Sequence, residues 1–335
     1  MNFVEETKCR VCKGNLKVVF NLGNLFVSDF IKEDEIGSKA PLALAECSDC
    51  GLIQLKHTVN LDSMYRKYWY RSGLNMSMRK DLEDVVHGVE SAFGGIPDNS
   101  IVVDIGCNDG TMFDFYTNKN IIKIGFDPAN NLAKDAWEHC NLFVNDYFSV
   151  KNYEFDKASV VTSIAMFYDL SDPNSFVEDV KQILAPDGIW VIQFTDLYSM
   201  LKINAIDNIC GEHLEYYKLW DLIYLLKLHG LKIFDCEYNM VNGGSLRVYA
   251  CHEDNQIFSE ETDRFFEAIR RENEYFNSGN QMELFKRRIS EIKEKTCSFI
   301  DLVNDGERKI YALAASTKAN TLLQTFGLGS NDIAA

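Results

Sequence analysis

The 335-residue chain lacks the features that would place it in a membrane, in a secretory route or on nucleic acid. No run of about 18 consecutive apolar residues occurs, so no membrane-spanning helix is predicted. The first residues have neither a basic start nor an apolar run, so no signal peptide is predicted. Basic residues are few, with 34 Lys and Arg against 50 Asp and Glu, a formal net charge of −16. Nucleic-acid binding depends largely on neutralising phosphates, so this balance argues against such a partner.

The remaining composition is that of an ordinary globular protein, 46% hydrophobic and 25% charged, with no internal repeat or low-complexity tract. The length predicts two or three domains. Ten cysteines without a secretion signal predict a reducing cytoplasm, with thiols that are free or bound to metal.

Two CxxC pairs near the start, Cys9–Cys12 and Cys47–Cys50, are the clearest chemical signal in the chain. Four thiolates in this doubled spacing can surround one Zn²⁺ as a tetrahedron. The alternatives are unrelated core cysteines or two disulfides. A four-thiolate site has no open position for a substrate, so we expect the metal to be structural.

The first 60 residues are expected to form a β module around the cysteine turns, with strands over residues 16–20 and 52–55. Residues 61–95 have a helical pattern that ends near Gly94, Gly95 and Pro97. After Pro97, the sequence pattern changes to alternating strands and helices.

Buried strands predicted over 101–106, 121–126, 157–163 and 189–194 alternate with helical stretches, which indicates a doubly wound parallel sheet. Pro186-Asp187-Gly188 is expected to end the helix before the fourth strand. Apolar runs over 231–241 and 246–251, joined by Asn-Gly-Gly-Ser, predict an antiparallel hairpin. A parallel sheet closed by such a hairpin is typical of class I S-adenosylmethionine (SAM)-dependent methyltransferases, and not of dehydrogenases.

The last part of the chain predicts a long helix over 281–303, ended by Gly306, then a strand over 309–316 and a helix over 319–326. One strand and one helix cannot bury their own faces, so this unit must pack on other parts of the chain.

A glycine turn follows the first predicted strand of the sheet. Gly106 permits a tight turn and Gly110 a close approach of a ligand. Asp127 ends the next strand, where a carboxylate can accept both ribose hydroxyls. The acidic turn suits the cationic groups of SAM better than a pyrophosphate; the alternative is a purely structural turn. The predicted cofactor residues are Asp104, Gly106, Asn108, Gly110, Asp127 and Asp146.

Glu212 and His213 follow the fourth strand and form the best candidate for acid–base chemistry. Histidine titrates near neutrality and can take a proton from a carbon beside a carbonyl, while a nearby carboxylate raises its basicity. The alternative is a partly buried histidine that caps a helix.

The stretch from residue 66 to residue 80 holds five basic residues and no carboxylate, with four aromatic residues in and beside it. Such a patch can hold a nucleotide diphosphate with its base stacked on a ring. The alternative is a solvated helix face. The basic residues are Arg66, Lys67, Arg71, Arg79 and Lys80.

Several segments together resemble the nucleotide-sugar C-methyltransferases that make branched deoxysugars, over nearly the whole chain. They are the cysteine pairs, Tyr68-Trp-Tyr70-Arg-Ser72, Asp104–Gly110, Cys210-Gly-Glu212-His213, Gly243-Gly244-Ser245-Leu-Arg247 and Lys318-Ala-Asn320-Thr321. The resemblance implies a zinc-binding domain over 1–60, a helical connector over 61–95 and a SAM domain over 96–253. It also implies a Rossmann-like domain over 254–335 that helps to hold the sugar nucleotide.

In that family a base removes the proton beside a sugar ketone, and the enolate carbon takes the methyl group of SAM. The resemblance makes His213 the base and Glu212 its partner, within a catalytic segment that includes Cys210. It makes Tyr70, Ser72 and Arg247 substrate contacts, and it brings Lys318 and Asn320 to the diphosphate.

The sequence departs from the family at three points. Cys210 stands where a catalytic tyrosine is usual, and Met166 stands where a histidine is frequent. Family members also continue past residue 335, so the last domain is expected to be incomplete. These departures leave two alternatives open: an O- or N-methyltransferase that needs no enolate, and a non-catalytic zinc scaffold with a degenerate methyltransferase domain.

Overall fold

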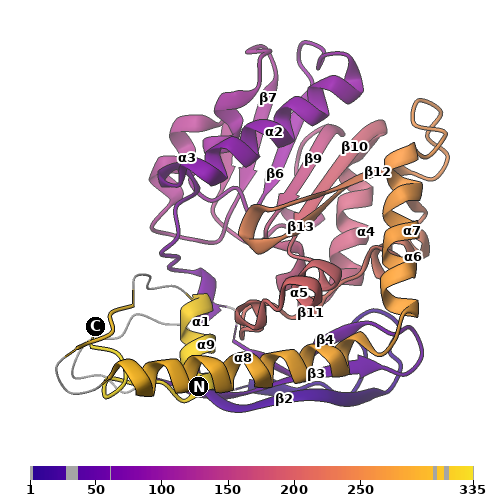
Figure 1. Ribbon diagram of the computed structural model, residues 1–335. Coiled ribbons are helices and arrows are strands. Elements are labelled where there is room, and N and C mark those ends of the chain that lie inside the picture. The colour runs from indigo at the N-terminus through magenta and orange to yellow at the C-terminus, as the bar shows by residue number, and fades with distance from the viewer. Residues whose placement is uncertain (1–2, 28–36, 61, 305–307, 313–316, 335) are drawn as a thin grey trace. The chain divides into compact units, whose positions relative to one another are not determined.

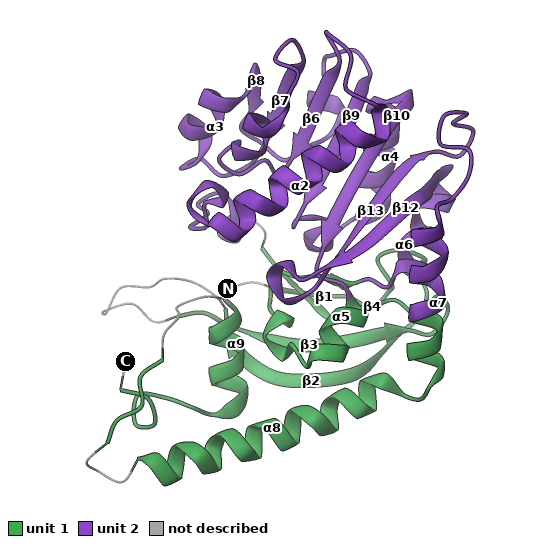
Figure 2. Cartoon of the chain, turned by 45° about the horizontal axis from the view of Figure 1, so that its top comes forward, with its two compact units in different colours: residues 1–60, 197–216, 272–335 green, residues 61–196, 217–271 purple. Residues whose placement is uncertain are grey.

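A computed structural model describes residues 3–27, 37–60, 62–304, 308–312 and 317–334. The chain divides into two compact units (Figure 2). Unit 1 contains residues 1–60, 197–216 and 272–335, and unit 2 contains residues 61–196 and 217–271. Each unit is therefore built from segments that are distant in the sequence.

Unit 2 is organised around a seven-stranded sheet in the order β12-β13-β10-β9-β6-β7-β8 (Figure 2). The pairs β8–β7, β7–β6, β6–β9 and β9–β10 are parallel, whereas β13 is antiparallel to both of its neighbours. This mixed sheet is the predicted class I methyltransferase fold. Its strands are β6 (Ile101–Ile105), β7 (Ile122–Phe126), β8 (Leu142–Val144), β9 (Ala158–Ile164), β10 (Leu184–Phe194), β12 (Leu231–Asn239) and β13 (Ser245–His252).

The core of unit 2 forms because its central strands are apolar on both faces. Every residue of β6 is buried, as expected for a strand covered on two sides. Helix α2 (Met76–Phe93) lies across one face (Figure 1) and buries Val85, Val86 and Val89 completely. The Asn75 side chain caps its start, and Gly94 ends it in the left-handed conformation.

The other helices of unit 2 are short. They are α1 (Asp62–Tyr65), α3 (Ala133–His139), α4 (Pro173–Ile183) and α6 (Leu219–Leu228), and α7 (Asp263–Asn277) carries the boundary with unit 1. Single 3₁₀ turns complete the unit: η1 (Ser72–Leu74), η2 (Thr111–Phe115), η3 (Val150–Asn152), η4 (Phe167–Asp169) and η6 (Val241–Gly243).

Unit 1 contains an antiparallel sheet in the order β11-β4-β3-β2 and a separate pair, β1–β5. The long helix α8 (Gln281–Val303) packs on β2, with the rings of Phe285 and Phe20 6.1 Å apart. Its other elements are β1 (Phe3–Glu5), β2 (Leu16–Phe26), β3 (Lys39–Cys47), β4 (Ile53–Leu55), β5 (His57–Val59), α5 (Leu197–Ile203), η5 (Ile206–Asn208), β11 (Glu215–Tyr216) and α9 (Thr317–Phe326).

Three local predictions need comment. The strand predicted over 309–316 is wrong where it can be judged, because residues 308–312 form no strand and Tyr311 is 68% exposed. Pro186-Asp187-Gly188 does not end a helix: α4 ends at Ile183, and the three residues lie in an irregular part of β10. Gly306, expected to end α8, lies outside the described residues. None of the helices in the described part of the chain combines the length and hydropathy needed to span a bilayer.

Candidate functional site

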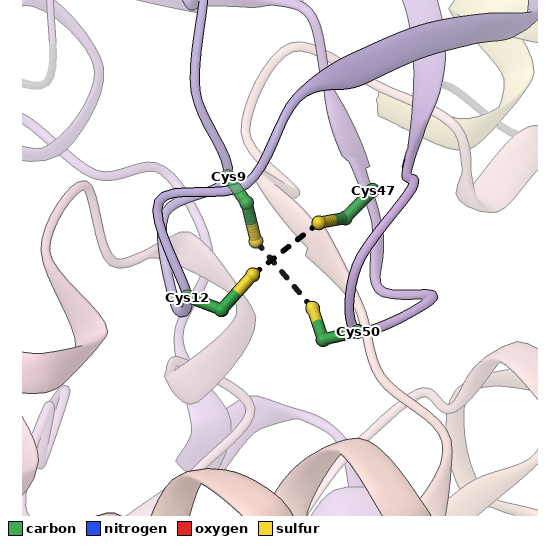
Figure 3. Close-up of side chains that lie close together, drawn as sticks. All are labelled: Cys9, Cys12, Cys47 and Cys50. Carbon is green, nitrogen blue, oxygen red and sulfur yellow. Dashed lines mark hydrogen bonds between the residues drawn. The ribbon is translucent and has the colours of Figure 1, made fainter.

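The four cysteines of the two CxxC pairs converge in unit 1 (Figure 3). All four sulfur atoms lie within 4.8 Å of one another. Cys9 Sγ is 3.7 Å from Cys50 Sγ, and Cys12 Sγ is 3.3 Å from Cys47 Sγ. A Zn–S distance of about 2.3 Å sets the sulfurs of a regular tetrahedron roughly 3.8 Å apart, so the cluster fits Zn²⁺. A disulfide needs sulfurs only about 2.05 Å apart, so that alternative is excluded.

The two cysteine turns have the same backbone design. Lys13 N–H donates to Cys9 O and Gly51 N–H donates to Cys47 O, both at 3.0 Å, and both donor residues have positive φ. The amides of Gly14 and Asp49 each lie 3.4 Å from a sulfur. Amide hydrogens aimed at sulfur stabilise thiolates, which are the form that binds metal.

In unit 2, the predicted glycine turn opens directly from the carboxyl end of β6. Gly106 and Gly110 have φ of 76° and 78°, a region that favours glycine. A Cβ on Gly110 would lie 3.2 Å from the backbone of Ala136, so a side chain there would push against α3. Both glycines are therefore required by the turn itself. The turn leaves backbone close to the sheet edge where ligands of open α/β folds bind.

Two buried carboxylates flank this turn. Asp104 is 4% exposed and accepts a hydrogen bond from Thr162 Oγ1 at 2.7 Å. Asp127 is 7% exposed and accepts from the amides of Asn108 at 2.9 Å and Ala129 at 2.8 Å. Burial raises the pKa of Asp104 to about 7 and that of Asp127 to about 6. Buried carboxylates with raised pKa values are prepared to receive a cation or hydroxyl donors.

The segment around Tyr70 and Ser72 docks on the glycine turn. Asn108 has φ of 54° and uses its side chain twice, accepting from Ser72 N–H at 2.9 Å and donating to Tyr70 O at 3.0 Å. Gly73 N–H donates to Asp109 Oδ2 at 2.8 Å. The sequence reasoning treated the two segments separately and missed this contact. Its only sequence signal was an asparagine within the glycine turn, a residue type that tolerates positive φ.

The basic patch of residues 66–80 is largely paired within unit 2. Arg66 donates to Asp146 at 2.9 Å, so the exposed Asp146 carboxylate is bound to the patch itself. Arg71 forms an ion pair with Asp135, and Lys67 lies 4.5 Å from the centre of the Trp69 ring.

Arg247 is buried in the sheet of unit 2 and has three protein partners. Its guanidinium donates to Gln193 Oε1 at 2.6 Å, Asp81 Oδ1 at 2.9 Å and Glu237 Oε1 at 3.0 Å. Arg247 is 4% exposed and Asp81 is 3% exposed. These partners fix the guanidinium at one wall of a cavity of about 780 Å³.

The segment with Cys210, Glu212 and His213 belongs to unit 1, after η5. His213 Nδ1 lies 2.9 Å from the backbone carbonyl of Asn208. A carbonyl only accepts, so Nδ1 carries the hydrogen and the lone pair of the neutral ring lies on Nε2. Burial, reinforced by Glu212, raises the pKa of the Cys210 thiol to about 12. The thiol therefore stays protonated at neutral pH.

Helix α9 packs on η5, which brings Lys318 to the same segment. Burial lowers the pKa of Lys318, while Asp207 and then Cys210 oppose this effect. Asn320 instead donates to Phe26 O at 3.0 Å and accepts from Gln324 at 2.9 Å. Unit 1 thus contains Glu212, His213 and Lys318, whereas the residues predicted for the cofactor lie in unit 2, together with Tyr70, Ser72 and Arg247.

Comparison with known proteins divides the chain by sequence into three consecutive parts. Residues 9–65 match a family described as a zinc binding domain, residues 77–235 a methyltransferase domain, and residues 240–335 a C-methyltransferase C-terminal domain. The chain is 28% identical to the C-methyltransferase NovU of Streptomyces niveus, over 97% of this chain and 80% of that protein.

Two solved structures are also similar. One is a methyltransferase bound to the Trm112 activator of Haloferax volcanii, with 17% identity, a TM-score of 0.42, and coverage of 53% of this chain and 94% of that chain. The other is the magnesium protoporphyrin IX methyltransferase of Synechocystis PCC 6803, with 14% identity, a TM-score of 0.42, and coverage of 53% and 88%.

The fold, the acidic glycine turn and the domain matches define a SAM-dependent methyltransferase with a four-cysteine zinc site. The expected resemblance to C-methyltransferases is confirmed, and it extends over all three matched parts of the chain. SAM supplies an electrophilic methyl group when bound. The residues that would hold SAM are the two buried carboxylates beside the glycine turn, Asp104 and Asp127.

Proposed function

We propose that this enzyme transfers the methyl group of SAM to a carbon of a nucleotide-linked keto-deoxysugar through an enolate. The observation that carries the proposal is the hydrogen bond of His213 Nδ1 to Asn208 O, which leaves Nε2 as the basic nitrogen. A C–H bond does not ionise unaided at neutral pH, so methylation at carbon needs such a base. A hydroxyl or amine acceptor has its own lone pair and needs no enolate.

The steps assigned to this chain's residues are simple. His213 Nε2 takes the proton from the carbon beside the ketone, and the C–H electron pair becomes the enolate. Burial raises the pKa of the neighbouring Glu212, and the positive charge of His213 opposes this rise. The Glu212 carboxylate therefore stabilises the imidazolium when that forms. The enolate carbon is then the nucleophile for the methyl group. Lys318 supplies positive charge in the same segment for the diphosphate.

The sugar nucleotide is proposed from three supports together. The motifs of Tyr70–Ser72 and Lys318–Asn320 resemble those of sugar-nucleotide enzymes. Lys318 lies near Asp207 and Cys210, because α9 packs on η5, and the relative NovU is a C-methyltransferase. We also propose that the chain acts without nucleic acid or membrane, in the cytoplasm.

Deuterium exchange tests the mechanism separately from methyl transfer. A TDP-linked 4-keto-6-deoxyhexose is the probe, incubated in D₂O with S-adenosylhomocysteine in place of SAM. We expect exchange at the carbon beside the ketone, seen by NMR, and a fall of roughly 10²- to 10⁴-fold in His213→Gln. S-adenosylhomocysteine should bind that variant with unchanged affinity, whereas Asp127→Ala should lose the binding.

His229→Gln is a matched control, because His229 lies in unit 2 and bonds to Glu178 at 3.0 Å and Asn174 at 3.1 Å. It should exchange like the wild type. Exchange that persists in His213→Gln would remove the imidazole as base. Methyl transfer to oxygen or nitrogen without exchange would establish the alternative methyltransferase. Cofactor binding with neither exchange nor transfer would indicate a scaffold.

A further inference from the structure

Arg10, between the first two zinc ligands Cys9 and Cys12, has a buried side chain that leaves the cysteine cluster. It is 3% exposed, which is unusual for arginine and requires good partners. Its Nη1 donates to Leu55 O at 2.9 Å and Leu214 O at 3.3 Å, and its Nη2 donates to Thr58 Oγ1 at 2.7 Å. One planar guanidinium therefore joins the zinc turn to β4, which contains Leu55, and to β5, which contains Thr58.

A carboxylate fixes the same guanidinium from the other side. Arg10 Nε lies 3.5 Å from Glu215 Oε1, and Glu215 is 1% exposed. The main-chain N–H of Arg10 donates to the fully buried Gln54 side chain at 2.8 Å. Glu6 lies at the edge, 3.8 Å from Nη2 and 2.8 Å from Thr58 Oγ1. Burial raises the pKa of Glu215 and the charge of Arg10 opposes the rise. Separation of the two groups would leave the buried guanidinium without this neighbour, so the pair resists displacement.

The strand held by Arg10 begins two residues after the proposed base. Leu214 and Glu215 follow His213 directly, and Glu215 pairs with Gln54 where β11 joins β4. Leu214 O accepts from Leu55 N–H at 2.8 Å as well as from Arg10. On the other side of His213, the Asn208 carbonyl fixes the ring. The His213 imidazole thus lies between the Asn208 carbonyl, which binds its ring, and β11, which Arg10 of the zinc turn binds at its start.

We propose that Arg10 is a positioning residue, through which the zinc site sets the orientation of the His213 imidazole. The inference rests on the proposed role of His213 as base. The zinc site then serves the reaction as well as the fold of unit 1. Arginine is required because its rigid fork reaches several acceptors at once, whereas a lysine ammonium is a single point charge.

Arg10→Lys is the test variant, since it keeps the positive charge and loses the fork. We expect unchanged zinc content and unchanged affinity for S-adenosylhomocysteine. Turnover should fall roughly 10- to 100-fold, mainly in kcat. Nitrogen-15 NMR of His213 should show loss of the single Nδ1–H tautomer. Hydrogen exchange at the Leu55 amide, which donates to Leu214 O, should accelerate at least about tenfold.

Arg288→Lys is the matched control in unit 1. Arg288 donates to Asn204 Oδ1 at 2.6 Å and Leu201 O at 2.8 Å, and both acceptors lie before His213 rather than in β11. It should keep the wild-type kcat and tautomer. Glu215→Gln is a second test variant of unchanged shape, and its effect should have the same direction as that of Arg10→Lys.

Two results would overturn the proposal: unchanged His213 nitrogen signals in Arg10→Lys, or a loss of activity that only follows a loss of zinc. The first of these results does not depend on turnover. If His213→Gln stays active while Arg10→Lys disturbs the ring, the proposed function fails and the positioning survives. If His213→Gln is inactive and Arg10→Lys behaves like Arg288→Lys, the positioning fails alone.

Discussion

Asp104→Asn should stabilise the ligand-free protein while weakening its binding of SAM. Asp104 lies near the end of β6, inside the core of unit 2, 4% exposed, with Thr162 Oγ1 as a hydrogen-bond donor at 2.7 Å. Burial is the main cause of its raised pKa, Thr162 opposes the rise, and the charge of Asp127 adds to it. The charged form is therefore costly in the folded protein. An asparagine of the same shape removes that cost and still accepts from Thr162.

The magnitude follows from the shift. The rise of the Asp104 pKa from the ordinary value of 3.8 to about 7 corresponds to a gain of at most about 4 kcal/mol in the free energy of unfolding for Asp104→Asn. The folded-state pKa lies above the unfolded one, so the folded state binds more protons between these values, and stability falls as pH rises through this window. The gain in the free energy of unfolding for Asp104→Asn should be near zero at about pH 4 and should approach its maximum above about pH 7.

Tryptophan fluorescence during urea unfolding measures this effect. At pH 8 the ligand-free variant should unfold at higher urea than the wild type, and at pH 4 the two should nearly coincide. Asp187→Asn, an exposed position in β10, is the control and should show neither change. Emission reports on unit 2 alone, because that unit contains all four tryptophans: Trp69, Trp137, Trp190 and Trp220.

Binding should move in the opposite direction. Loss of the carboxylate beside the cationic cofactor should weaken SAM binding roughly 10- to 100-fold by calorimetry at pH 8. A variant that is no more stable than the wild type at pH 8 would refute the burial argument. A stabilised variant that binds SAM normally would remove Asp104 from the cofactor site.

Two further predictions concern the zinc site and the glycine turn. Cys47→Ser should lose zinc, as measured by metal analysis, and should unfold unit 1 at lower urea; full metal content would contradict the four-sulfur site. Gly110→Ala should cost roughly 1–2 kcal/mol from its positive φ, plus the displacement of Ala136 and α3, and should lower affinity for S-adenosylhomocysteine. Unchanged stability and affinity would show that the turn tolerates a side chain.

Local patterns in the sequence were sufficient for much of the fold. The apolar run of β6, the hairpin of β12 and β13 around Asn242–Ser245, and the limits of α8 were all predictable, because periodicity and turn chemistry act within a few residues. The strand expected over 309–316 is wrong for residues 309–312, which form no strand, since an apolar run becomes a strand only where another strand can pair with it.

The candidate site shows the same division. The spacing of Cys9, Cys12, Cys47 and Cys50 was enough to predict a four-sulfur site, because the geometry of zinc fixes that pattern. The sequence also placed Asp127 at a strand end. It did not show that Asn108 would bind the Tyr70–Ser72 segment, or that Arg247 would be surrounded by protein partners.

By itself, the sequence determined the chemistry available to this protein: four thiolates for a metal, an acidic glycine turn and one imidazole beside a carboxylate. Tertiary structure alone decided which of these groups act on one another. Arg10 donates to the carbonyl of Leu214, which lies 204 residues later in the sequence, and no local sequence pattern predicts this contact. Long-range contacts depend on how buried surfaces and charges are matched in space, and that matching exists only once the chain has folded.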